Sequence, residues 1–396
     1  MSMTPLPTTN QETYELEMRH GSGLYQTRPV ALVRGLGATL WDADGNEYLD
    51  CIGGHGVVNV GHCNPDVVAA IQAQAAKLIT CPTSFPNEHR AALMADLVSI
   101  APGKMERVFF CNSGAEAVEA AFKFARMSTG RTGIIAAKNA FHGRTMGALS
   151  ATWNSAYKKP FEPLVPGFSH VAPNDIAALE EAITDDTAAV ILEPVQGESG
   201  VRPLDGDYLR AAQALCRQRG ALFIADEIQT GFGRTGKMFT CEHYGLEPDL
   251  LCMAKSIAGG VPMGGVLIGP RVGELASQSH GTTFGGSALA CAAARAAINY
   301  IVSHKLPERA AELGAYFLEQ LRQIDSPVIR EVRGLGLMIG VELKKRSGEY
   351  LAKLMQEHRV LALAAGPLVI RYLPPLVISK EQIDRAVEAT AHVLAE

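Results

Sequence analysis

The chain has 396 residues, of which 47% are hydrophobic and 19% charged, and its formal net charge is −5. This composition is typical of a globular protein, and the weakly negative charge argues against a nucleic-acid-binding surface. No segment approaches the roughly 18 consecutive apolar residues of a membrane-spanning helix, so no membrane partner is expected either. The length favours two domains, or one large domain with a smaller lobe.

Residues 1–17 are polar and acidic, and they lack the basic start and the apolar core of a signal peptide. The eight cysteines are scattered without a CxxC pair, which indicates reduced thiols rather than a disulfide framework. We therefore expect a cytoplasmic protein. No group of His, Cys, Asp and Glu residues has the spacing of a metal site, so no metal is expected.

Short apolar runs in residues 30–49 surround an Asp-Gly type turn at 42–47, which predicts a small antiparallel meander. From about residue 64, helical patterns alternate with continuous apolar runs, which predicts βαβ units and one large, mostly parallel sheet buried on both faces. The predicted strands are 107–111, 133–137, 188–192, 221–225, 250–253 and 265–268. The predicted helices are 65–78, 86–100, 115–128, 176–183 and 207–219.

The C-terminal part of the chain predicts a smaller α+β domain. Two helices are expected before it and one at its end, with three strands between them: helices 286–304, 307–324 and 380–395, and strands 328–333, 337–343 and 369–373. The predicted domains are an N-terminal arm with part of the small domain (1–60), a large cofactor-binding domain (61–290), and a linking helix with the C-terminal small domain (291–396).

Lys255 and Asp226 are candidate catalytic residues because each follows a predicted strand, where side chains reach the crevice at the sheet edge. A lysine amine forms an imine with an aldehyde, and a carboxylate against a pyridine nitrogen keeps that nitrogen protonated. The pair therefore favours a pyridoxal 5'-phosphate site. The alternatives are a solvated lysine and a carboxylate that caps a helix or a turn.

The segment Ser113-Gly114-Ala115 joins a predicted buried strand to a predicted helix. Unpaired N–H groups and the positive end of the helix dipole meet at such a junction, which suits a phosphate. The alternative is that Ser113 only caps the helix.

Three further residues are candidates because of their chemistry. Phe141 offers a ring face for stacking, and Arg144 offers a guanidinium for a carboxylate. Gln229, three residues after Asp226, is placed to contact the phenolic oxygen of a pyridoxal ring. Their alternatives are a core phenylalanine, a surface arginine and a loop glutamine bonded to backbone.

The order of six motifs resembles that of the class III pyridoxal phosphate-dependent aminotransferases. These are Asn-Ser-Gly-x-Glu-Ala from 112, Phe-His-Gly-Arg-Thr from 141, Glu-Pro-Val-Gln-Gly-Glu from 193, Asp-Glu-Ile-Gln-Thr-Gly-x-Gly-Arg-Thr-Gly from 226, the lysine at 255, and His-Gly-Thr-Thr-Phe-Gly-Gly from 280. The resemblance covers about residues 15–394. It is strongest to the acetylornithine aminotransferase branch, which includes members acting on lysine precursors attached to the carrier protein LysW.

The resemblance implies fold type I, an α/β transferase fold, and a homodimer whose active sites are shared between subunits. It implies that Lys255 forms the cofactor imine and carries protons, and that Asp226 contacts the pyridine nitrogen. The other implied cofactor contacts are those of Ser113, Gly114 and Ala115 with the phosphate, Phe141 with the ring face, Gln229 with the ring oxygen, and Thr283 of the other subunit with the phosphate.

The resemblance also implies how substrates bind. Arg371 matches the arginine that holds an α-carboxylate, Arg144 matches one that holds the distal carboxylate, and Glu198 matches a glutamate that pairs with the first arginine. If Glu198 neutralises Arg371 when a terminal amine binds and releases it for glutamate, one pocket serves both substrates. Ala115 departs from the threonine of many relatives, which removes one hydroxyl contact to the phosphate.

The implied reaction moves an amino group between glutamate or 2-oxoglutarate and the terminal carbon of a blocked amino acid semialdehyde, in lysine or arginine biosynthesis. The blocking group is either an acetyl group or an acidic carrier protein, for which the basic runs 158–159 and 344–346 are candidate contacts. Alternatives are a broader ω-aminotransferase, an aminomutase, and a cofactor-binding protein without turnover. His55 is either a substrate contact or an ordinary loop residue.

Overall fold

The computed structural model describes residues 3–395. Its central sheet has seven strands, in the order β4–β12–β11–β10–β7–β5–β6. β12 is antiparallel to both of its neighbours, and all other pairs are parallel. The predicted α/β fold with a large, mostly parallel sheet is confirmed. The strands are β4 (Arg107–Cys111), β5 (Gly133–Ala137), β6 (Phe168–Val171), β7 (Thr187–Leu192), β10 (Leu222–Asp226), β11 (Leu250–Met253) and β12 (Gly264–Ile268).

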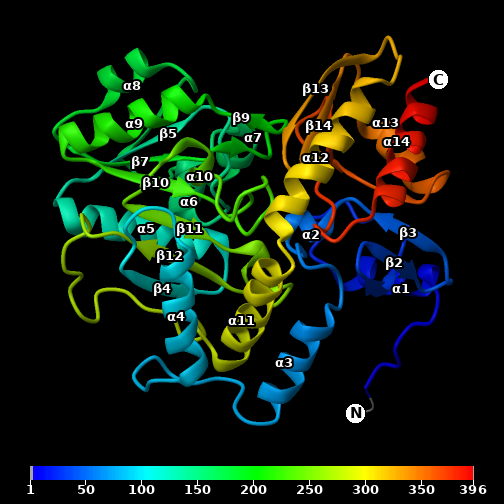
Figure 1. Cartoon of the computed structure of the whole chain (residues 1–396), viewed down its shortest axis with the longest axis horizontal. Coiled ribbons are helices and arrows are strands. Elements are labelled where there is room, and N and C mark those ends of the chain that lie inside the picture. The colour runs from blue at the N-terminus through cyan, green and yellow to red at the C-terminus, as the bar shows by residue number, and fades with distance from the viewer. Residues whose placement is uncertain (1–2, 396) are drawn as a thin grey trace.

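Alternate residues of the central strands pack into two cores, because successive side chains of a strand point to opposite faces. In β10, Leu222 and Ile224 belong to the core that includes α5 (Gly114–Thr129), whereas Phe223 and Ala225 belong to the core on the other face. Helices on that face contribute side chains to this second core, with α8 and α9 above and α4 and α11 below in Figure 1: α4 (Glu88–Ile100), α8 (Ile176–Ala182), α9 (Gly206–Arg219) and α11 (Ala288–Ser303).

A second, four-stranded sheet lies in the orange and red part of Figure 1, in the order β13–β14–β17–β16. Its strands are antiparallel to their neighbours, and α12 (Leu306–Arg322) packs on β13 and on the C-terminal helix α14 (Lys380–Ala395). The strands are β13 (Ile329–Leu335), β14 (Met338–Leu343), β16 (Leu363–Ala364) and β17 (Val369–Tyr372), and α13 (Gly348–Gln356) packs beside α14.

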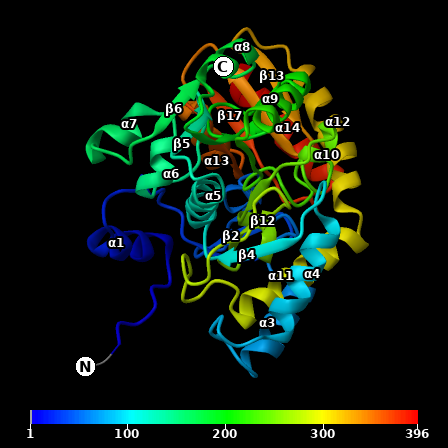
Figure 2. The same ribbon diagram turned by 90° about the vertical axis from the view of Figure 1, so that its left-hand side faces the viewer.

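The N-terminal meander forms a third sheet that also includes a C-terminal strand. β15 (Val360–Leu361) pairs in parallel with β3 (Glu47–Asp50), so the two ends of the chain build one lobe. The other members are β1 (Leu32–Leu36) and β2 (Thr39–Asp42). Helix α1 (Asn10–His20) has no buried residue and stands apart from the body in Figure 2. Helix α3 (Pro65–Ala75) packs on α11.

All six predicted strands of the large sheet are present, each within one residue of its predicted bounds. β6 was not predicted, because it is an edge strand whose residues, Phe-Ser-His-Val, are mostly not buried and form no apolar run. The remaining short elements lie around the ends of the central strands or between helices: α2 (Gly53–Gly56), α6 (Met146–Ala151), α7 (Ser155–Lys158), η1 (Lys159–Phe161), β8 (Val195–Gln196), β9 (Arg202–Pro203), α10 (Cys241–Tyr244) and η2 (Lys255–Ala258).

Between residues 3 and 395, no helix combines the length and the apolar character that crossing a membrane requires. In the same range, no group of His, Cys, Asp and Glu residues is arranged to hold a metal ion. All eight cysteines are free thiols, and six of them are buried.

Candidate active site

A cavity of about 470 Å³ lies at the carboxyl end of the central sheet. β4, β5, β7, β10 and β11 all run in one direction, so their carboxyl ends meet at one edge, where ligands bind in open α/β sheets. Each of these strands contributes a lining residue at or soon after its end, namely Ser113, Phe141, Glu193, Asp226 and Lys255.

Lys255 begins the short helix η2 just after β11 and has a φ of 46°, in the left-handed region that few non-glycine residues adopt. Burial lowers the pKa of its amine to about 8, with a further contribution from the charge of Arg371. The carboxylates of Glu198 and Asp226 oppose this shift. A substantial fraction of Lys255 is therefore neutral, and so able to act as a base, slightly above neutral pH.

Asp226 ends β10 and shares a contact with His142, whose Nδ1 lies 2.7 Å from Oδ2 of Asp226. The backbone N–H of Ile228 donates to the other carboxylate oxygen at 3.1 Å. Both side chains are buried, and Nε2 of His142 has no hydrogen-bond partner among residues 3–395. Glu227, in contrast, accepts from the backbone N–H of Cys241 at 2.7 Å, so its carboxylate lies in the core.

Glu193 also contributes a carboxyl group to the lining of the cavity, as Asp226 does. It accepts from the backbone N–H of Phe141 at 2.8 Å and from that of Gly197 at 3.3 Å. Burial raises its pKa to about 7, against the opposing effect of His142. Glu193 thus links the segment after β5 to the loop that carries Glu198.

The N-terminus of α5 lines another wall. Ser113 caps the helix, because its Oγ accepts from the backbone N–H of Glu116 at 3.2 Å. Gly114 and Ala115 form the first turn, whose N–H groups have no partner within the helix. The hydroxyl proton of a capping serine remains available for donation, so capping and phosphate binding are compatible at Ser113.

Arg371, on β17 of the second sheet, contacts two residues that line the cavity. Its side chain is 1% exposed, and its Nη1 donates to Oε1 of Glu198 at 2.7 Å and to Oε1 of Gln229 at 3.3 Å. Burial acts to raise the pKa of Glu198, but the charges of Arg371 and Lys255 outweigh it and the net shift is downward. Nε of Arg371 has no partner in the described part of the chain.

The remaining predicted residues lie at the edge of the cavity or outside it. Arg144 is exposed at the mouth, with its guanidinium 3.6 Å from the centre of the Tyr157 ring. Phe141 is half-buried and meets the edge of the same ring. Thr283 is exposed and does not line the cavity of its own chain, and neither does His55.

Sequence reasoning missed His142 and Glu193. Both lie inside quoted motifs, and Glu193 follows a predicted strand just as Asp226 does, which was the available signal. No local pattern marks the contact between His142 and Asp226, because 84 residues separate them in the chain.

The arrangement fits pyridoxal 5'-phosphate. One space is surrounded by a lysine amine, a buried carboxylate, an aromatic ring and the N-terminus of a long helix, which match the aldehyde, the pyridine nitrogen, the ring face and the phosphate. The unpartnered nitrogens of His142 and Arg371 are buried polar atoms of the kind that a ligand or ordered water satisfies.

The chain belongs to the aminotransferase class-III family, whose model matches residues 23–394. It is therefore a pyridoxal phosphate-dependent aminotransferase. It is 50% identical over 381 residues to a [LysW]-aminoadipate semialdehyde transaminase of Deinococcus radiodurans, covering 96% of this chain and 89% of that protein. It is 46% identical over 390 residues to an acetylornithine aminotransferase of Methanothermobacter thermautotrophicus, covering 98% and 99%.

Solved structures with this fold include an ornithine aminotransferase of Toxoplasma gondii, with a TM-score of 0.94 and 34% identity, covering 98% of this chain and 94% of that one. An acetylornithine aminotransferase of Elizabethkingia anophelis has a TM-score of 0.87 and 33% identity, covering 98% and 99%. The predicted fold type I is confirmed by these neighbours.

Proposed function

We propose that this enzyme moves an amino group between glutamate and the terminal carbon of a blocked amino acid semialdehyde, with lysine biosynthesis as the main setting and arginine biosynthesis as the alternative. The observation that carries the proposal is the pair of Arg371 and Glu198 beside Lys255. Relatives named for carrier-linked and for acetylated substrates of this kind support it.

In this proposal, Lys255 and Asp226 are the catalytic residues. Bound pyridoxal phosphate supplies a ring that accepts electrons from the substrate carbon that loses its proton. Nζ of Lys255 takes that proton, a role for which its lowered pKa suits it. The carboxylate of Asp226 would hold the pyridine nitrogen, and His142 orients this carboxylate.

The other cofactor contacts follow from position. Ser113, Gly114 and Ala115 hold the phosphate at the start of α5, and Phe141 covers one ring face. The side-chain NH₂ group of Gln229 donates to the ring oxygen. This contact is compatible with the bond from Arg371, because Arg371 uses only the carbonyl oxygen of the Gln229 side chain.

Arg371 and Glu198 let one pocket accept two kinds of amine. Glutamate carries a carboxylate next to its reacting carbon, and Arg371 binds it after Glu198 moves aside. A terminal amine has no carboxylate there, so Glu198 stays on Arg371 and prevents an unpaired buried charge. Arg144, at the cavity mouth, holds the distal carboxylate of glutamate.

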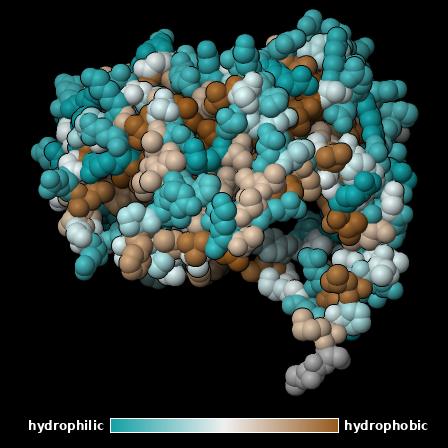
Figure 3. All heavy atoms as spheres, turned by 60° about the horizontal axis from the view of Figure 1, so that its bottom comes forward, coloured by the Kyte–Doolittle hydropathy of each residue, from teal (hydrophilic) through white to brown (hydrophobic). Residues whose placement is uncertain are grey.

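The two active sites of a homodimer are proposed to be shared. Thr283 and Phe284 lie in an exposed loop, and Phe284 is 63% exposed. Other large apolar side chains are also exposed between α3 and α4, including Ile79, which is 58% exposed, and Phe85, which is 64% exposed. Figure 3, in which the bottom of Figure 1 comes forward, shows brown hydrophobic residues spread over this face. A second copy would bury this surface and bring Thr283 to the neighbouring phosphate.

A second cavity, of about 550 Å³, supports a long, blocked substrate. It shares Phe141 and Glu198 with the first cavity, so the two adjoin beside the reacting centre. Neutral hydrogen-bonding residues and two further aromatic rings line much of it, which suits an amide-linked chain: Asn139, Thr152, Trp153, Asn154, Ser155, Tyr157 and Ser199.

The predicted basic runs adjoin this second cavity. Lys158 and Lys159 directly follow Tyr157, which lines it. The run 344–346 precedes Ser347, whose backbone N–H donates to the carbonyl of Pro367, another lining residue, at 2.9 Å. We therefore propose that an acidic amino-group carrier protein docks at this rim.

The eight free cysteines suit a reducing compartment such as the cytoplasm.

Amino transfer to 2-oxoglutarate, compared between N-acetylornithine and lysine linked to its acidic carrier, tests the substrate. We expect kcat/KM to be at least about tenfold higher for the carrier-linked substrate at low salt, and this preference to fall at high salt as exposed charges are screened. A preference for N-acetylornithine at both salt concentrations would assign the enzyme to arginine biosynthesis instead.

A further inference from the structure

Glu198 is held by a short β-hairpin. It lies in the loop 197–201, which joins β8 to β9, and the backbone N–H of Val201 closes this loop by donating to the carbonyl of Gly197 at 3.4 Å. β9 packs against β13 of the second sheet. The position of the Glu198 carboxylate therefore depends on how this loop is held against that sheet.

The loop has an unusual backbone. Val201 has a φ of 53°, in the left-handed region, where a β-branched residue is a genuine outlier. Gly200 has a φ of 111°, and a Cβ there would lie 2.8 Å from Nη2 of Arg333. Such conformations persist only where the surroundings impose them.

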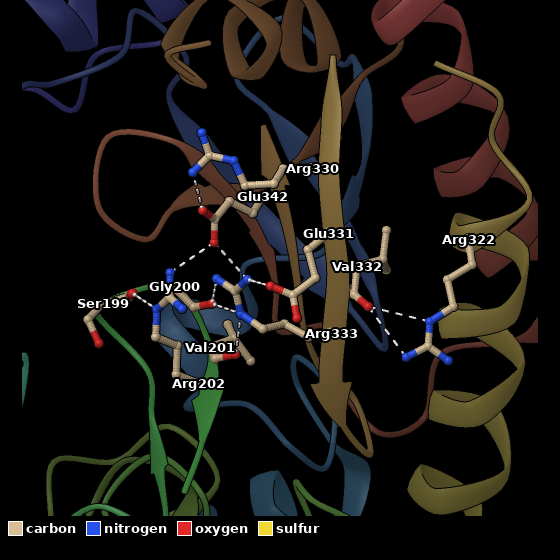
Figure 4. A network of polar contacts seen from close by, with 10 residues as sticks. All are labelled: Ser199, Gly200, Val201, Arg202, Arg322, Arg330, Glu331, Val332, Arg333 and Glu342. Carbon is tan, nitrogen blue, oxygen red and sulfur yellow. Dashed lines mark hydrogen bonds and ion pairs between the residues drawn. The ribbon is translucent and has the colours of Figure 1, made fainter. Parts of the chain in front are cut away.

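Arg333, on β13, donates to the carbonyls of these two residues. Its Nε donates to the carbonyl of Gly200 at 2.9 Å and to that of Val201 at 3.1 Å, and its Nη2 donates to Gly200 at 2.6 Å. Its Nη1 lies 2.7 Å from Glu342 and 2.6 Å from Glu331. Arg333 is 9% exposed, and Figure 4 shows its guanidinium between the hairpin and the two carboxylates.

Glu342 connects the hairpin to the strand next to Arg371. It lies on β14 and pairs not only with Arg333 but also with Arg202, an arginine of the hairpin, at 2.9 Å. On the same strand, Gly340 is the register partner of Arg371. A Cβ at Gly340 would lie 3.1 Å from the carbonyl oxygen of Gly200. The loop therefore packs against β14 at the residue that pairs with Arg371.

We propose that Arg333 is a positioning residue for Glu198. It holds the loop 197–201 so that the Glu198 carboxylate rests on Arg371, and it thereby sets how readily a substrate carboxylate displaces Glu198. The inference rests on the proposed exchange at Arg371. It makes Arg333 a determinant of the preference between glutamate and an amine that lacks a neighbouring carboxylate, although Arg333 does not line the cavity.

Calorimetric binding of glutarate to the holoenzyme tests this positioning role. Glutarate has the two carboxylates of glutamate but no amine, so it competes with Glu198 for Arg371 without reacting. We expect Glu198→Gln and Arg333→Lys each to tighten glutarate binding by roughly three- to tenfold, because less competition remains. The double variant should bind glutarate no more tightly than Glu198→Gln alone, because both changes act through one carboxylate.

Arg330→Lys is the matched control. Arg330 pairs with the other oxygen of Glu342 at 2.9 Å, and its described contacts do not include the loop, so its replacement should leave glutarate affinity unchanged. Glu342→Gln is a second variant for the case in which Arg333→Lys does not fold. It keeps the size of the side chain but removes the charge that pairs with Arg333, and we expect it to tighten glutarate binding as well.

The outcomes separate the two proposals. If Glu198→Gln tightens binding and Arg333→Lys leaves it unchanged or weakens it, Arg333 has only a structural role. If Glu198→Gln does not tighten binding, the exchange at Arg371 is wrong and the positioning role fails with it. As a kinetic check, Arg333→Lys should lower kcat/KM for the terminal amine about five- to tenfold relative to that for glutamate, and Arg330→Lys should not change this ratio.

Discussion

Arg371 and Glu198 are 173 residues apart in the chain, yet one nitrogen of the buried guanidinium lies 2.7 Å from the carboxylate. The two residues come from different sheets, since Arg371 is on β17 and Glu198 is in the β8–β9 hairpin. The side chain of Arg371 is 1% exposed and that of Glu198 is 34% exposed, so the charge left unpaired when Glu198 moves away is the buried guanidinium, which is strongly unfavourable. Any substrate that displaces Glu198 must therefore bring a carboxylate of its own.

Replacing Arg371 by alanine should separate the two half-reactions. Glutamate loses the group that holds its α-carboxylate, so its kcat/KM should fall by roughly 10²-fold or more. A terminal amine makes no such contact, so its half-reaction should fall much less and serves as the internal control. Stopped-flow absorbance of the cofactor with each amine measures both rates. An Arg371→Ala enzyme that keeps normal reaction with glutamate would show that Arg371 does not bind that carboxylate.

The contact between Asp226 and His142 predicts a graded loss of activity. Asp226→Asn removes the negative charge that we place against the pyridine nitrogen, so kcat should fall by roughly 10²- to 10³-fold. His142→Asn leaves that charge and removes only its partner, so its loss should be smaller. The measurements are kcat and the Kd for pyridoxal phosphate. Equal losses in the two variants would mean that His142 has more than an orienting role.

Lys255 predicts how fast the apoenzyme captures its cofactor at different pH values. Only the neutral amine attacks an aldehyde, and burial lowers the pKa of this amine to about 8. The capture rate should therefore rise about tenfold per pH unit below pH 8 and level off above it. Glu198→Gln removes a charge that raises this pKa, so the midpoint should move to lower pH. A rate that still climbs above pH 9.5 would indicate an ordinary lysine pKa of about 10.4.

Mixed dimers test whether Thr283 acts in the neighbouring site. Lys255→Ala inactivates its own site, whereas Thr283→Asp should place a carboxylate against the phosphate of the partner's site. A mixed dimer then contains one site with both native residues, so random mixing should recover about a quarter of wild-type activity from two inactive proteins. The assay is turnover after the two variants are unfolded and refolded together. No recovery from two inactive proteins would mean that Thr283 acts within its own chain, whereas a Thr283→Asp protein that is active by itself would mean that Thr283 does not contact the phosphate.

The sequence predicted the elements of the large sheet well, because strands buried on both faces are continuous apolar runs. The same logic failed at β6, where one sheet edge leaves polar residues exposed. It also failed at β8 and β9, which are two residues each and therefore too short to show a pattern.

Candidate site residues could be predicted from the sequence where chemistry and a strand end coincide, as at Asp226 and Lys255. Residues whose importance comes from a distant partner could not. In the sequence, His142 is an ordinary loop histidine, and only the structure shows its contact with Asp226. Likewise, Arg333 is an ordinary strand residue of the small lobe until the structure shows its bonds to the carbonyls of Gly200 and Val201. Such contacts depend on tertiary packing, and no periodicity records them.

Transfer of nitrogen from labelled glutamate tests the central claim most directly. The holoenzyme is incubated with [¹⁵N]glutamate and a blocked semialdehyde, either acetylated or carrier-linked, and the products are analysed by mass spectrometry. We predict that ¹⁵N appears on the terminal carbon of the blocked product, with one 2-oxoglutarate formed for each amine, and that Lys255→Ala abolishes both. Nitrogen that stays within one substrate molecule without 2-oxoglutarate would instead indicate an aminomutase. No transfer to either acceptor would contradict the account.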